Sequence, residues 1–238
     1  MSLETELATP ERKRRYVRAL FSTIADRYDL ITVLLSYGRD RTWKRRLVDL
    51  AEPVAGAQAL DLATGTGDIA YAVQARGGHV TGLDITPRMV HLARGKAPRD
   101  RRPGFLVGDM QALPFPGASF DLVTTGYGLR NVPDLSGALD EILRVLKPGG
   151  LALSLDFDRP RNAIVRGAYL SYLTVVGGVL GWLLHRDPDT YRYISASIRR
   201  YPGAAAVARL MESRGFTDVS YHRVLGGLMA IHRGRKTG

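Results

Sequence analysis

The sequence predicts an α/β fold in which a mostly parallel, seven-stranded sheet has helices on both faces. Short apolar runs alternate with stretches of helical periodicity from residue 58 to residue 157, and buried strands that alternate with helices form parallel βαβ units. Two further strand candidates follow a helical stretch near the end of the chain. The 238 residues, 45% of them apolar, are sufficient for one large domain.

The chain begins with a polar segment that is followed by a helical region. Residues 1–15 are strongly charged, so we expect a flexible basic tail. Apolar residues then recur at helical spacing over 16–35 and over 42–51. We therefore interpret residues 16–52 as a helical cover on a single domain that spans 16–238.

Seven apolar runs are the strand candidates. They are short, and turn-forming or acidic residues follow most of them. They lie at 59–63, 79–84, 105–107, 120–125, 151–157, 216–223 and 228–232. Helices are expected between them, after the first strand as far as residue 76 and over 87–94, 135–146 and 204–213. Residues 158–200 interrupt this alternation, and we interpret them as a helical insertion after the fifth strand.

The composition excludes several kinds of site. The chain has no cysteine, which rules out a disulfide framework, a thiolate zinc site, an iron–sulfur cluster and a cysteine nucleophile. The histidines lack metal-ligand spacing, so no metal is expected, and GxSxG, HExxH and P-loop motifs are absent from the sequence. The N-terminal residues do not form a secretory signal pattern, so we expect a cytoplasmic location.

The charge balance is strongly positive. With 34 basic and 23 acidic residues the net charge is +11, which favours anionic partners such as nucleic acid or an anionic membrane surface. A solvated basic face without any partner is the alternative. No aromatic-rich RNA-binding motif is present, so no nucleic acid is expected. The sequence is compatible with both a monomer and a homodimer.

A glycine-rich turn, DLATGTGD, joins the first predicted strand to a helix and contains Asp61, Gly65, Gly67 and Asp68. Glycines at such a turn allow a ligand to approach the backbone at a helix N-terminus. The same spacing also matches the dinucleotide fingerprint. However, the two carboxylates would repel a pyrophosphate, whereas they would attract a ligand that carries an ammonium and a sulfonium.

Two more acids follow the next two predicted strands. Asp84 ends the second strand, 19 residues after Gly65, where an acid can accept hydrogen bonds from ribose hydroxyls. Asp109 follows the third strand, a natural position for contact with an adenine amino group. Each acid alone is also typical of a helix N-cap. Together with Asp61 they favour S-adenosylmethionine over NAD as the ligand.

Several longer segments are similar to one enzyme family. From about Phe21 to Lys236 the chain resembles the C-methyltransferase family of ubiquinone and menaquinone biosynthesis. The segment GLRNV and the residues around Tyr28 are the most specific to that family, whereas many methyltransferases share the glycine turn and RVLKPGG. The matching segments are FSTIADRYDL (21–30), SYGRDRTWK (36–44), GLDITPRMV (82–90), LPFPGASFDLVTTGYGLRNVPD (113–134), RVLKPGG (144–150), YRYISASI (191–198) and GF (215–216).

The resemblance implies a Rossmann-like class I methyltransferase fold. It also implies methyl transfer from S-adenosylmethionine, which leaves S-adenosylhomocysteine, to a ring carbon of a polyprenylated quinol (demethylmenaquinol or a benzoquinol). Cofactor contacts are expected at Asp61, Gly65, Thr66, Gly67, Asp84, Ile85, Asp109, Met110 and Gly126.

On the substrate side, the resemblance assigns catalytic roles to Arg130 and Asn131 and substrate contacts to Tyr28 and Tyr127. The chain departs from the common family pattern at three positions that bear on the identity of the acceptor. They are Thr32, where an Asn is usual, Gly126, where a Ser is common, and Asp156, where a Glu is common.

The chemistry of this reaction requires an ionised acceptor, because a quinone carbon is a poor nucleophile and a hydroquinone anion is a good one. A fixed cation beside the hydroxyl lowers its pKa, and Arg130 is the candidate, with Asn131 holding the oxygen or the guanidinium. Arginine is too basic to accept the proton. We therefore hypothesise that a water molecule or Asp156 takes it.

The uncharged stretch over 167–184 has three interpretations: a membrane span, a core helix, or a lid or channel for an isoprenoid tail. Its 18 residues are fewer than the roughly 20 that a span needs. The basic clusters at 12–15, 39–46 and 99–102 predict peripheral docking on an anionic bilayer, and a solvated basic face is the alternative.

Three alternative functions remain open from the sequence. A methyltransferase of the same fold that acts on a small aromatic natural product differs in having a tight pocket without lipid preference. A basic nucleic-acid-binding protein and an NAD-dependent enzyme are the alternatives from other classes, and both lack support from specific motifs.

Overall fold

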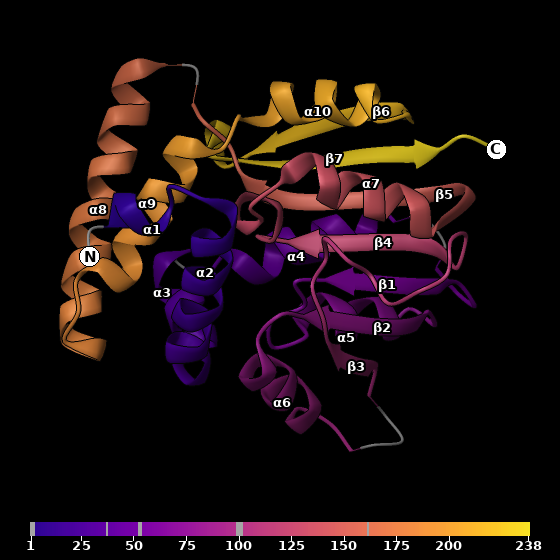
Figure 1. The fold of residues 1–238 in the computed structure, drawn as a ribbon, viewed down its shortest axis with the longest axis horizontal. Coiled ribbons are helices and arrows are strands. Elements are labelled where there is room, and N and C mark those ends of the chain that lie inside the picture. The colour runs from indigo at the N-terminus through magenta and orange to yellow at the C-terminus, as the bar shows by residue number, and fades with distance from the viewer. Residues whose placement is uncertain (1–2, 37, 52–53, 99–101, 161) are drawn as a thin grey trace.

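The computed structural model describes residues 3–36, 38–51, 54–98, 102–160 and 162–238, and Figure 1 shows its fold. One sheet contains seven strands. They are β1 (Gln58–Leu62), β2 (His79–Asp84), β3 (Gly104–Val107), β4 (Phe120–Gly126), β5 (Leu146–Phe157), β6 (Phe216–Val224) and β7 (Met229–Lys236). Their order across the sheet is β3-β2-β1-β4-β5-β7-β6.

The first five strands pair in parallel, and β7 lies antiparallel between β5 and β6. The predicted mostly parallel α/β sheet is thus confirmed. The observed strands differ from the predicted ones mainly at two ends. β5 begins at Leu146 rather than Leu151, because Phe120 of β4 already pairs with Leu146 before a shift in register. β7 continues to Lys236 rather than ending at His232, because it pairs with β6 as far as Phe216.

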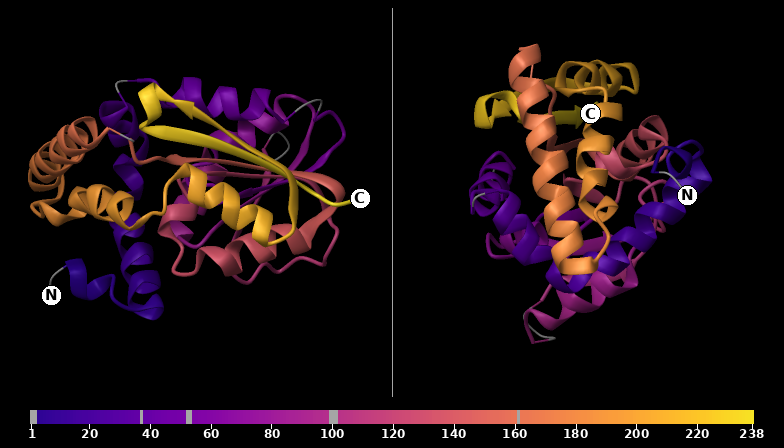
Figure 2. Two further views of the ribbon diagram at one scale, coloured as in Figure 1. Left: turned by 90° about the horizontal axis from the view of Figure 1, so that it is seen from above. Right: turned by 90° about the vertical axis from the view of Figure 1, so that its left-hand side faces the viewer.

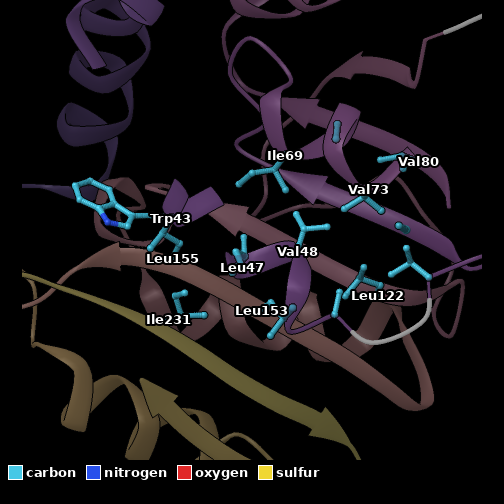
Figure 3. Close-up of a cluster of buried hydrophobic side chains, with 14 of the residues drawn as sticks. Trp43, Leu47, Val48, Ile69, Val73, Val80, Leu122, Leu153, Leu155 and Ile231 are labelled. Carbon is cyan, nitrogen blue, oxygen red and sulfur yellow. The ribbon is translucent and has the colours of Figure 1, made fainter. Parts of the chain in front are cut away.

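Helices cover both faces of the sheet. On one face lie α4 (Asp40–Asp49), α5 (Asp68–Gln74) and α6 (Pro87–Gly95), and on the other lie α7 (Leu135–Val145) and α10 (Ala204–Ser213). Figure 3 shows Leu47 and Val48 of α4 between Val73 of α5 and the side chains of the central strands. Leu47 and Val48 are fully buried, so α4 anchors the N-terminal region firmly to the sheet.

A second group of helices gathers at the carboxyl ends of the parallel strands (Figures 1 and 2). Its N-terminal members precede the sheet and its other members form the insertion after β5. They are α1 (Leu3–Glu6), α2 (Pro10–Ile24), the 3-10 turn η1 (Ala25–Arg27), α3 (Tyr28–Leu35), α8 (Ala163–His185) and α9 (Asp189–Arg200). Tyr191 and Tyr193 of α9 pack with Val17, Leu20 and Ile31, so the two parts of the group share one apolar cluster.

The expected flexible tail differs from what the structure shows. Residues 10–15 are the first part of α2, and residues 3–6 form α1. The local cause is a helix start signal: Thr9 accepts a hydrogen bond from the backbone N–H of Arg12, and Pro10 occupies the first helical turn. Lys13 and Arg14 in addition have partners elsewhere in the fold, which are described below.

The insertion begins with a helix that exposes much of its apolar surface. α8 has 23 residues, so the length argument against a membrane span does not hold for the helix as observed. By length and composition it is sufficient to cross a membrane, and 28% of its most apolar window is buried. A plain core helix would be mostly buried, so the low buried fraction of α8 also disagrees with that interpretation. The glycines Gly177, Gly178 and Gly181 face α9, where a Cβ atom would meet atoms of α9 or of the preceding turn.

Candidate active site

A narrow cleft lies at the carboxyl ends of the parallel strands, and we call it the strand-end cleft. Its volume is about 80 Å³, less than the 300 Å³ or more of typical ligand pockets. The sheet side is formed by the predicted residues Gly65, Asp84, Ile85, Asp109, Met110 and Gly126. These residues come from the carboxyl ends of four different strands or from the turns that follow them, and the parallel topology brings them together.

The glycine turn is built around Asp84. One carboxylate oxygen of Asp84 accepts a hydrogen bond from the backbone N–H of Gly65 at 2.9 Å, and the other accepts one from the N–H of Thr86 at 2.8 Å. Burial raises the pKa of Asp84, and these two hydrogen bonds oppose that rise. Gly65 and Gly67 have φ values of +55° and +87°, a region that glycine enters without a steric penalty.

The N-terminal helix closes the opposite side of the strand-end cleft. Arg14, Val17 and Phe21 of α2 line it, and the Arg14 guanidinium forms an ion pair of 3.1 Å with Asp109. The preceding residue, Lys13, donates hydrogen bonds to the backbone carbonyls of Arg130 and Val132 at 3.2 and 2.5 Å. α2 is therefore attached to both ends of the cleft, which explains why the cleft is narrow.

A second cavity, the apolar cavity, has a volume of about 510 Å³. It lies between the N-terminal helices α2 and α3 and the insertion helices α8 and α9. Its walls are mainly aromatic and aliphatic, and Tyr169, Tyr172 and Leu173 are the contribution of α8. Arg130 is among the few charged side chains that line it.

The two cavities meet at three aromatic residues. Phe21, Tyr28 and Tyr127 line both of them. Burial raises the pKa of Tyr28, and burial together with Asp40 raises that of Tyr127 far above its ordinary value, so both phenols are neutral. A group bound in the strand-end cleft and a group bound in the apolar cavity would face each other across these rings.

Arg130 and Asn131 lie on the 3-10 turn η3 (Leu129–Asn131), which follows β4. Arg130 is 7% exposed, and its guanidinium carbon lies 4.9 Å from the centre of the Phe157 ring. The side chains of Arg130 and Asn131 both donate to the backbone carbonyl of Tyr127, at 3.0 and 2.8 Å. The buried Nε of Arg130 has no hydrogen-bond partner within the described residues.

Asp156 holds this turn from below. Its side chain is fully buried and lines neither cavity. One carboxylate oxygen accepts the backbone N–H of Arg130 at 3.1 Å, and the other accepts the N–H of Phe157 at 2.8 Å and lies 3.7 Å from Nε of Arg130. Burial raises the pKa of Asp156, and the neighbouring Arg130 opposes the rise.

Three predicted cofactor residues do not line the strand-end cleft. Asp61 is buried under the turn, where it accepts hydrogen bonds from the hydroxyls of Thr64 and Thr124 at 2.6 and 2.8 Å. Burial raises its pKa to about 6. Thr66 donates instead to Asp29 at 2.6 Å, and Gly67 is the N-cap of α5.

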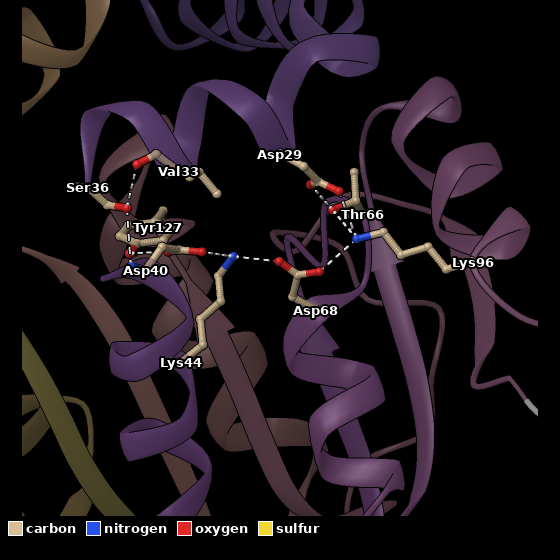
Figure 4. Close-up of polar contacts among 9 residues, drawn as sticks. All are labelled: Asp29, Val33, Ser36, Asp40, Lys44, Thr66, Asp68, Lys96 and Tyr127. Carbon is tan, nitrogen blue, oxygen red and sulfur yellow. Dashed lines mark hydrogen bonds and ion pairs between the residues drawn. The ribbon is translucent and has the colours of Figure 1, made fainter. Parts of the chain in front are cut away.

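A chain of ion pairs connects the helical cover to the glycine turn (Figure 4). Lys44 of α4 contacts Asp40 at 2.6 Å and Asp68 at 2.9 Å, and Lys96 contacts Asp68 and Asp29 at 2.7 and 3.0 Å. Burial alone would lower the pKa of Lys44, but its anionic and phenolic neighbours raise it above the ordinary value. The hydroxyl of Tyr127 donates to Asp40 at 2.7 Å, which adds the junction of the two cavities to the same chain.

Sequence reasoning did not assign roles to Lys13, Asp40 or Tyr193. Tyr193 of α9 donates its hydroxyl to Oδ1 of Asn131 at 2.9 Å, a contact between residues 62 positions apart. The sequence places Lys13 in the expected flexible tail and in the basic cluster 12–15, and it places Asp40 and Tyr193 only within matching segments. The start signal at Thr9 and Pro10 was the available indication for Lys13, whereas nothing local indicates the other two contacts.

Comparison with known proteins identifies the family. A family model described as the ubiE/COQ5 methyltransferase family matches residues 9–236. The chain belongs to this family. It is 38% identical over 236 residues to a demethylmenaquinone methyltransferase of Roseiflexus sp. (strain RS-1), which covers 98% of this chain and 99% of that relative. It is also 38% identical over 239 residues to a ubiquinone/menaquinone biosynthesis C-methyltransferase UbiE of Azotobacter vinelandii, covering 96% and 93% of the two chains.

Solved structures show the same fold at low sequence identity. A SAM-dependent methyltransferase from Thermotoga maritima superposes with a TM-score of 0.68 at 20% identity, covering 93% of this chain and all of that one. A methyltransferase from Haloferax volcanii, solved with the activator Trm112, gives a TM-score of 0.69, also at 20% identity, over 92% and 98% of the two chains. The Rossmann-like class I methyltransferase fold implied by the family resemblance is thus confirmed.

Proposed function

We propose that this chain transfers a methyl group from S-adenosylmethionine to a ring carbon of a reduced, prenylated quinol in menaquinone or ubiquinone biosynthesis. The observation that carries the proposal is the meeting of two unlike cavities at Phe21, Tyr28 and Tyr127. One is a cleft at a glycine turn with acidic strand ends, which suits a cationic nucleoside. The other is a large apolar cavity with a single buried arginine near the junction, which suits a lipid-like quinol.

The residues of the strand-end cleft fit S-adenosylmethionine. Asp84 is fixed by two backbone N–H groups and would accept the ribose hydroxyls, while Asp109 and Met110 would contact the adenine. Gly65, where a Cβ would face Tyr28 at the junction, would allow close approach of the backbone. The bound cofactor supplies an electrophilic methyl group on a sulfonium. Asp61 stabilises the glycine turn through its hydrogen bond with Thr64, and its carboxylate would attract the positive charge of the cofactor bound at that turn.

Arg130 is the group that would stabilise the quinol anion. Its guanidinium lines the apolar cavity, so its positive charge would stabilise a nearby oxygen that develops negative charge. Its buried Nε lies on the side of Asp156, 3.7 Å from that carboxylate. Asn131 and Tyr193 fix the turn that carries it. Asp156 accepts the backbone N–H of Arg130, so we assign it the role of positioning Arg130.

The apolar cavity would hold the first part of the prenyl tail. Each buried CH₂ stabilises binding by about 0.8 kcal/mol, so even partial enclosure among the side chains of α3, α8 and α9 favours a lipid acceptor. A small aromatic natural product would leave most of the 510 Å³ unfilled. The size and lining of the cavity therefore favour the prenylated quinol.

The proposal includes peripheral contact with the anionic inner face of the cell membrane. The outer face of α8 exposes Ile164, Val175, Val179, Trp182 and Leu183, with Trp182 at 62% exposure, and α8 forms one end of the molecule beside the apolar cavity (Figure 2). Exposed apolar patches of this kind mark interaction surfaces, and a quinol that resides in a bilayer would enter from that side.

The predicted basic clusters contribute less to such a surface than their composition indicates. Lys13 and Arg14 are engaged with the rest of the fold, and Lys44 is buried. The other exposed arginines of these clusters are Arg12, Arg15, Arg39, Arg41, Arg45 and Arg46, whereas residues 99–101 lie outside the described residues. We therefore attribute membrane contact to the apolar face of α8, assisted by these exposed arginines.

The acceptor is tested by methyl transfer from S-adenosylmethionine under reducing conditions. Prenylated demethylnaphthoquinol, prenylated benzoquinol, the same head groups without a tail, and the oxidised quinones are compared. We expect turnover only with reduced acceptors and a large gain from the tail. Equal turnover of a tail-free aromatic would favour the natural-product alternative.

The identity of the cofactor is tested separately by calorimetry. We expect S-adenosylmethionine to bind and NAD not to bind, and we expect Asp84→Ala to abolish the binding of S-adenosylmethionine.

Membrane contact is tested by sedimentation with liposomes of increasing anionic lipid content. Binding of the wild type should rise with anionic lipid, fall with salt and be strongly reduced by Trp182→Ser, whereas Val107→Ser, at another exposed apolar residue, should have no effect. Light scattering without lipid is the complementary measurement. A stable homodimer that buries α8, or binding that ignores Trp182→Ser, would contradict this assignment.

A further inference from the structure

The proposed reaction still requires a proton acceptor near the acceptor hydroxyl. Arg130 cannot serve, because a guanidinium holds its protons at any physiological pH. Asp156 is fully buried, accepts two backbone N–H groups and lines neither cavity. A different carboxylate, Asp40, is connected to the junction of the two cavities through Tyr127.

Tyr127 is placed with unusual constraint. It has a φ of +60°, a left-handed conformation that is uncommon for a bulky residue and that clusters at functional sites. Its N–H donates to the carbonyl of Leu155 at 2.7 Å, and its own carbonyl accepts the two hydrogen bonds from Arg130 and Asn131. The same residue thus fixes the cation on one side and presents a phenol to both cavities on the other.

The phenol of Tyr127 leads to a paired carboxylate. It donates to Oδ1 of Asp40 at 2.7 Å, and Oδ2 of Asp40 lies 2.6 Å from Nζ of Lys44 (Figure 4). Asp40 is 3% exposed. Lys44 has a second anionic partner, Asp68, at 2.9 Å, so its charge stays compensated if Asp40 becomes protonated.

We propose that Tyr127 and Asp40 form the proton relay of this enzyme. The quinol hydroxyl gives its proton to the phenol oxygen of Tyr127 as the phenol proton moves to Oδ1 of Asp40, which leaves a quinol anion beside Arg130. After the ring carbon has gained its methyl group, that carbon loses its hydrogen as a proton to water, which restores the aromatic ring. The proton on Asp40 then returns through Tyr127 to the quinol oxygen, so one proton is released per turnover.

The charges around Tyr127, Asp40 and Lys44 favour passage of the proton through Tyr127 over a long-lived change in the protonation of its phenol. Burial and the neighbouring carboxylate raise the pKa of Tyr127, so a tyrosinate is unfavourable and the phenol exchanges one proton for another. The charged or titratable groups that interact with Tyr127, Asp40 or Lys44 are Tyr28, Asp61, Asp68, Arg130 and Asp156, besides the interactions among the three themselves.

The experiment compares Tyr127→Phe, Asp40→Asn and the double variant with the wild type. The first readout needs no methyl donor: the absorbance of bound, anaerobically reduced demethylnaphthoquinol carrying a short prenyl tail is titrated with pH. We expect the bound quinol to ionise at a higher pH in each variant than in the wild type. The second readout is single-turnover methyl transfer, in which each variant loses a factor of about 10² to 10⁴, with the loss shrinking as the pH rises.

The double variant distinguishes a relay from two separate roles, because members of one relay are not additive. It should be no slower than the slower single variant. Asp140→Asn, at an exposed carboxylate paired with Arg214 on the far side of the sheet, is the matched control and should behave as the wild type. Melting temperatures report whether each variant is folded.

The relay is overturned if Tyr127→Phe, folded, keeps more than a third of the wild-type rate or leaves the ionisation of bound quinol unchanged. A loss that is equal at every pH and additive in the double variant indicates a structural role and also overturns it. If Asp40→Asn does not fold, Tyr127→Phe still decides, because it removes a single oxygen. The inference rests on the proposed function, and a wild type inactive on every quinol would contradict that function instead.

Discussion

Replacing Arg130 tests how the proposed active site stabilises charge. The guanidinium lies in the wall of the apolar cavity over the Phe157 ring, and it donates to the carbonyl of Tyr127. A unit charge about 4 Å from an oxyanion contributes about 4 kcal/mol at the effective dielectric of a partly buried site, and loss of one such donor typically costs a factor of about 10² to 10³ in kcat. Arg130→Gln should fall in that range.

Arg130→Lys separates charge from geometry. Lysine keeps a positive charge but cannot make the planar contacts of the guanidinium, so we expect a loss of about 100-fold, nearer to the glutamine variant than to the wild type. Affinity for S-adenosylmethionine should change less than about threefold in either variant, since Arg130 does not line the strand-end cleft.

The assay measures kcat with a reduced prenylated quinol and, separately, cofactor affinity by calorimetry. Arg214→Lys, at an exposed ion pair with Asp140, is the matched control and should be fully active. A lysine variant with wild-type kcat would refute the role of the guanidinium, and so would a loss of cofactor affinity as large as the loss of kcat.

Three further changes have expected outcomes. Arg14→Ser removes the ion pair that holds α2 to Asp109, so stopped-flow fluorescence should show faster binding and release of S-adenosylmethionine; unchanged rates would contradict the closing role of α2. The pKa of Asp61 is raised by burial from 3.8 to about 6, so the folded chain holds a proton that the unfolded chain releases, and stability falls by about 3 kcal/mol as the pH rises through that interval. Asp61→Asn should remove this fall in urea titrations at about pH 4 and pH 7. Leu47→Ala, at a fully buried side chain, should lower the free energy of unfolding by about 2–5 kcal/mol.

Much of the fold could be predicted because it depends on local patterns. The strands β1, β2 and β4 are short apolar runs bounded by turns or acids, and α10 begins and ends at the predicted residues. β5 was predicted to start too late because its first residues contain Pro148 and a glycine pair, which read as a turn. In the structure they lie within β5 at the shift in register between Leu146, which pairs with Phe120, and Leu151, which pairs with Leu122.

The contents of the site were predictable to a lesser extent. Residues that follow a parallel strand, such as Asp84 and Asp109, must lie at one edge of the sheet, and both line the cleft. Asp61 follows the same pattern, but the hydroxyls of Thr64 and Thr124 draw its carboxylate inside. Which way a strand-end side chain turns depends on partners that are distant in sequence, and the sequence alone does not show them.

The contacts that sequence reasoning missed all come from the N-terminal helices and from the insertion after β5. Lys13 and Asp40 reach η3 and Tyr127 across 117 and 87 residues of chain, and Tyr193 reaches Asn131 from the insertion. Such contacts form only when separate helical segments pack at the carboxyl ends of the strands. They are properties of the tertiary fold rather than of any motif.

The central claim is that a methyl group passes from the strand-end cleft to a quinol carbon in the apolar cavity. The most direct test is a single turnover of the wild type with S-adenosylmethionine carrying a ¹³C-labelled methyl group and reduced, prenylated demethylnaphthoquinol, followed by NMR of the product. We expect the label as a methyl group on a ring carbon, together with one equivalent of S-adenosylhomocysteine. Label on an oxygen, or no transfer by protein that binds S-adenosylmethionine, would contradict the account.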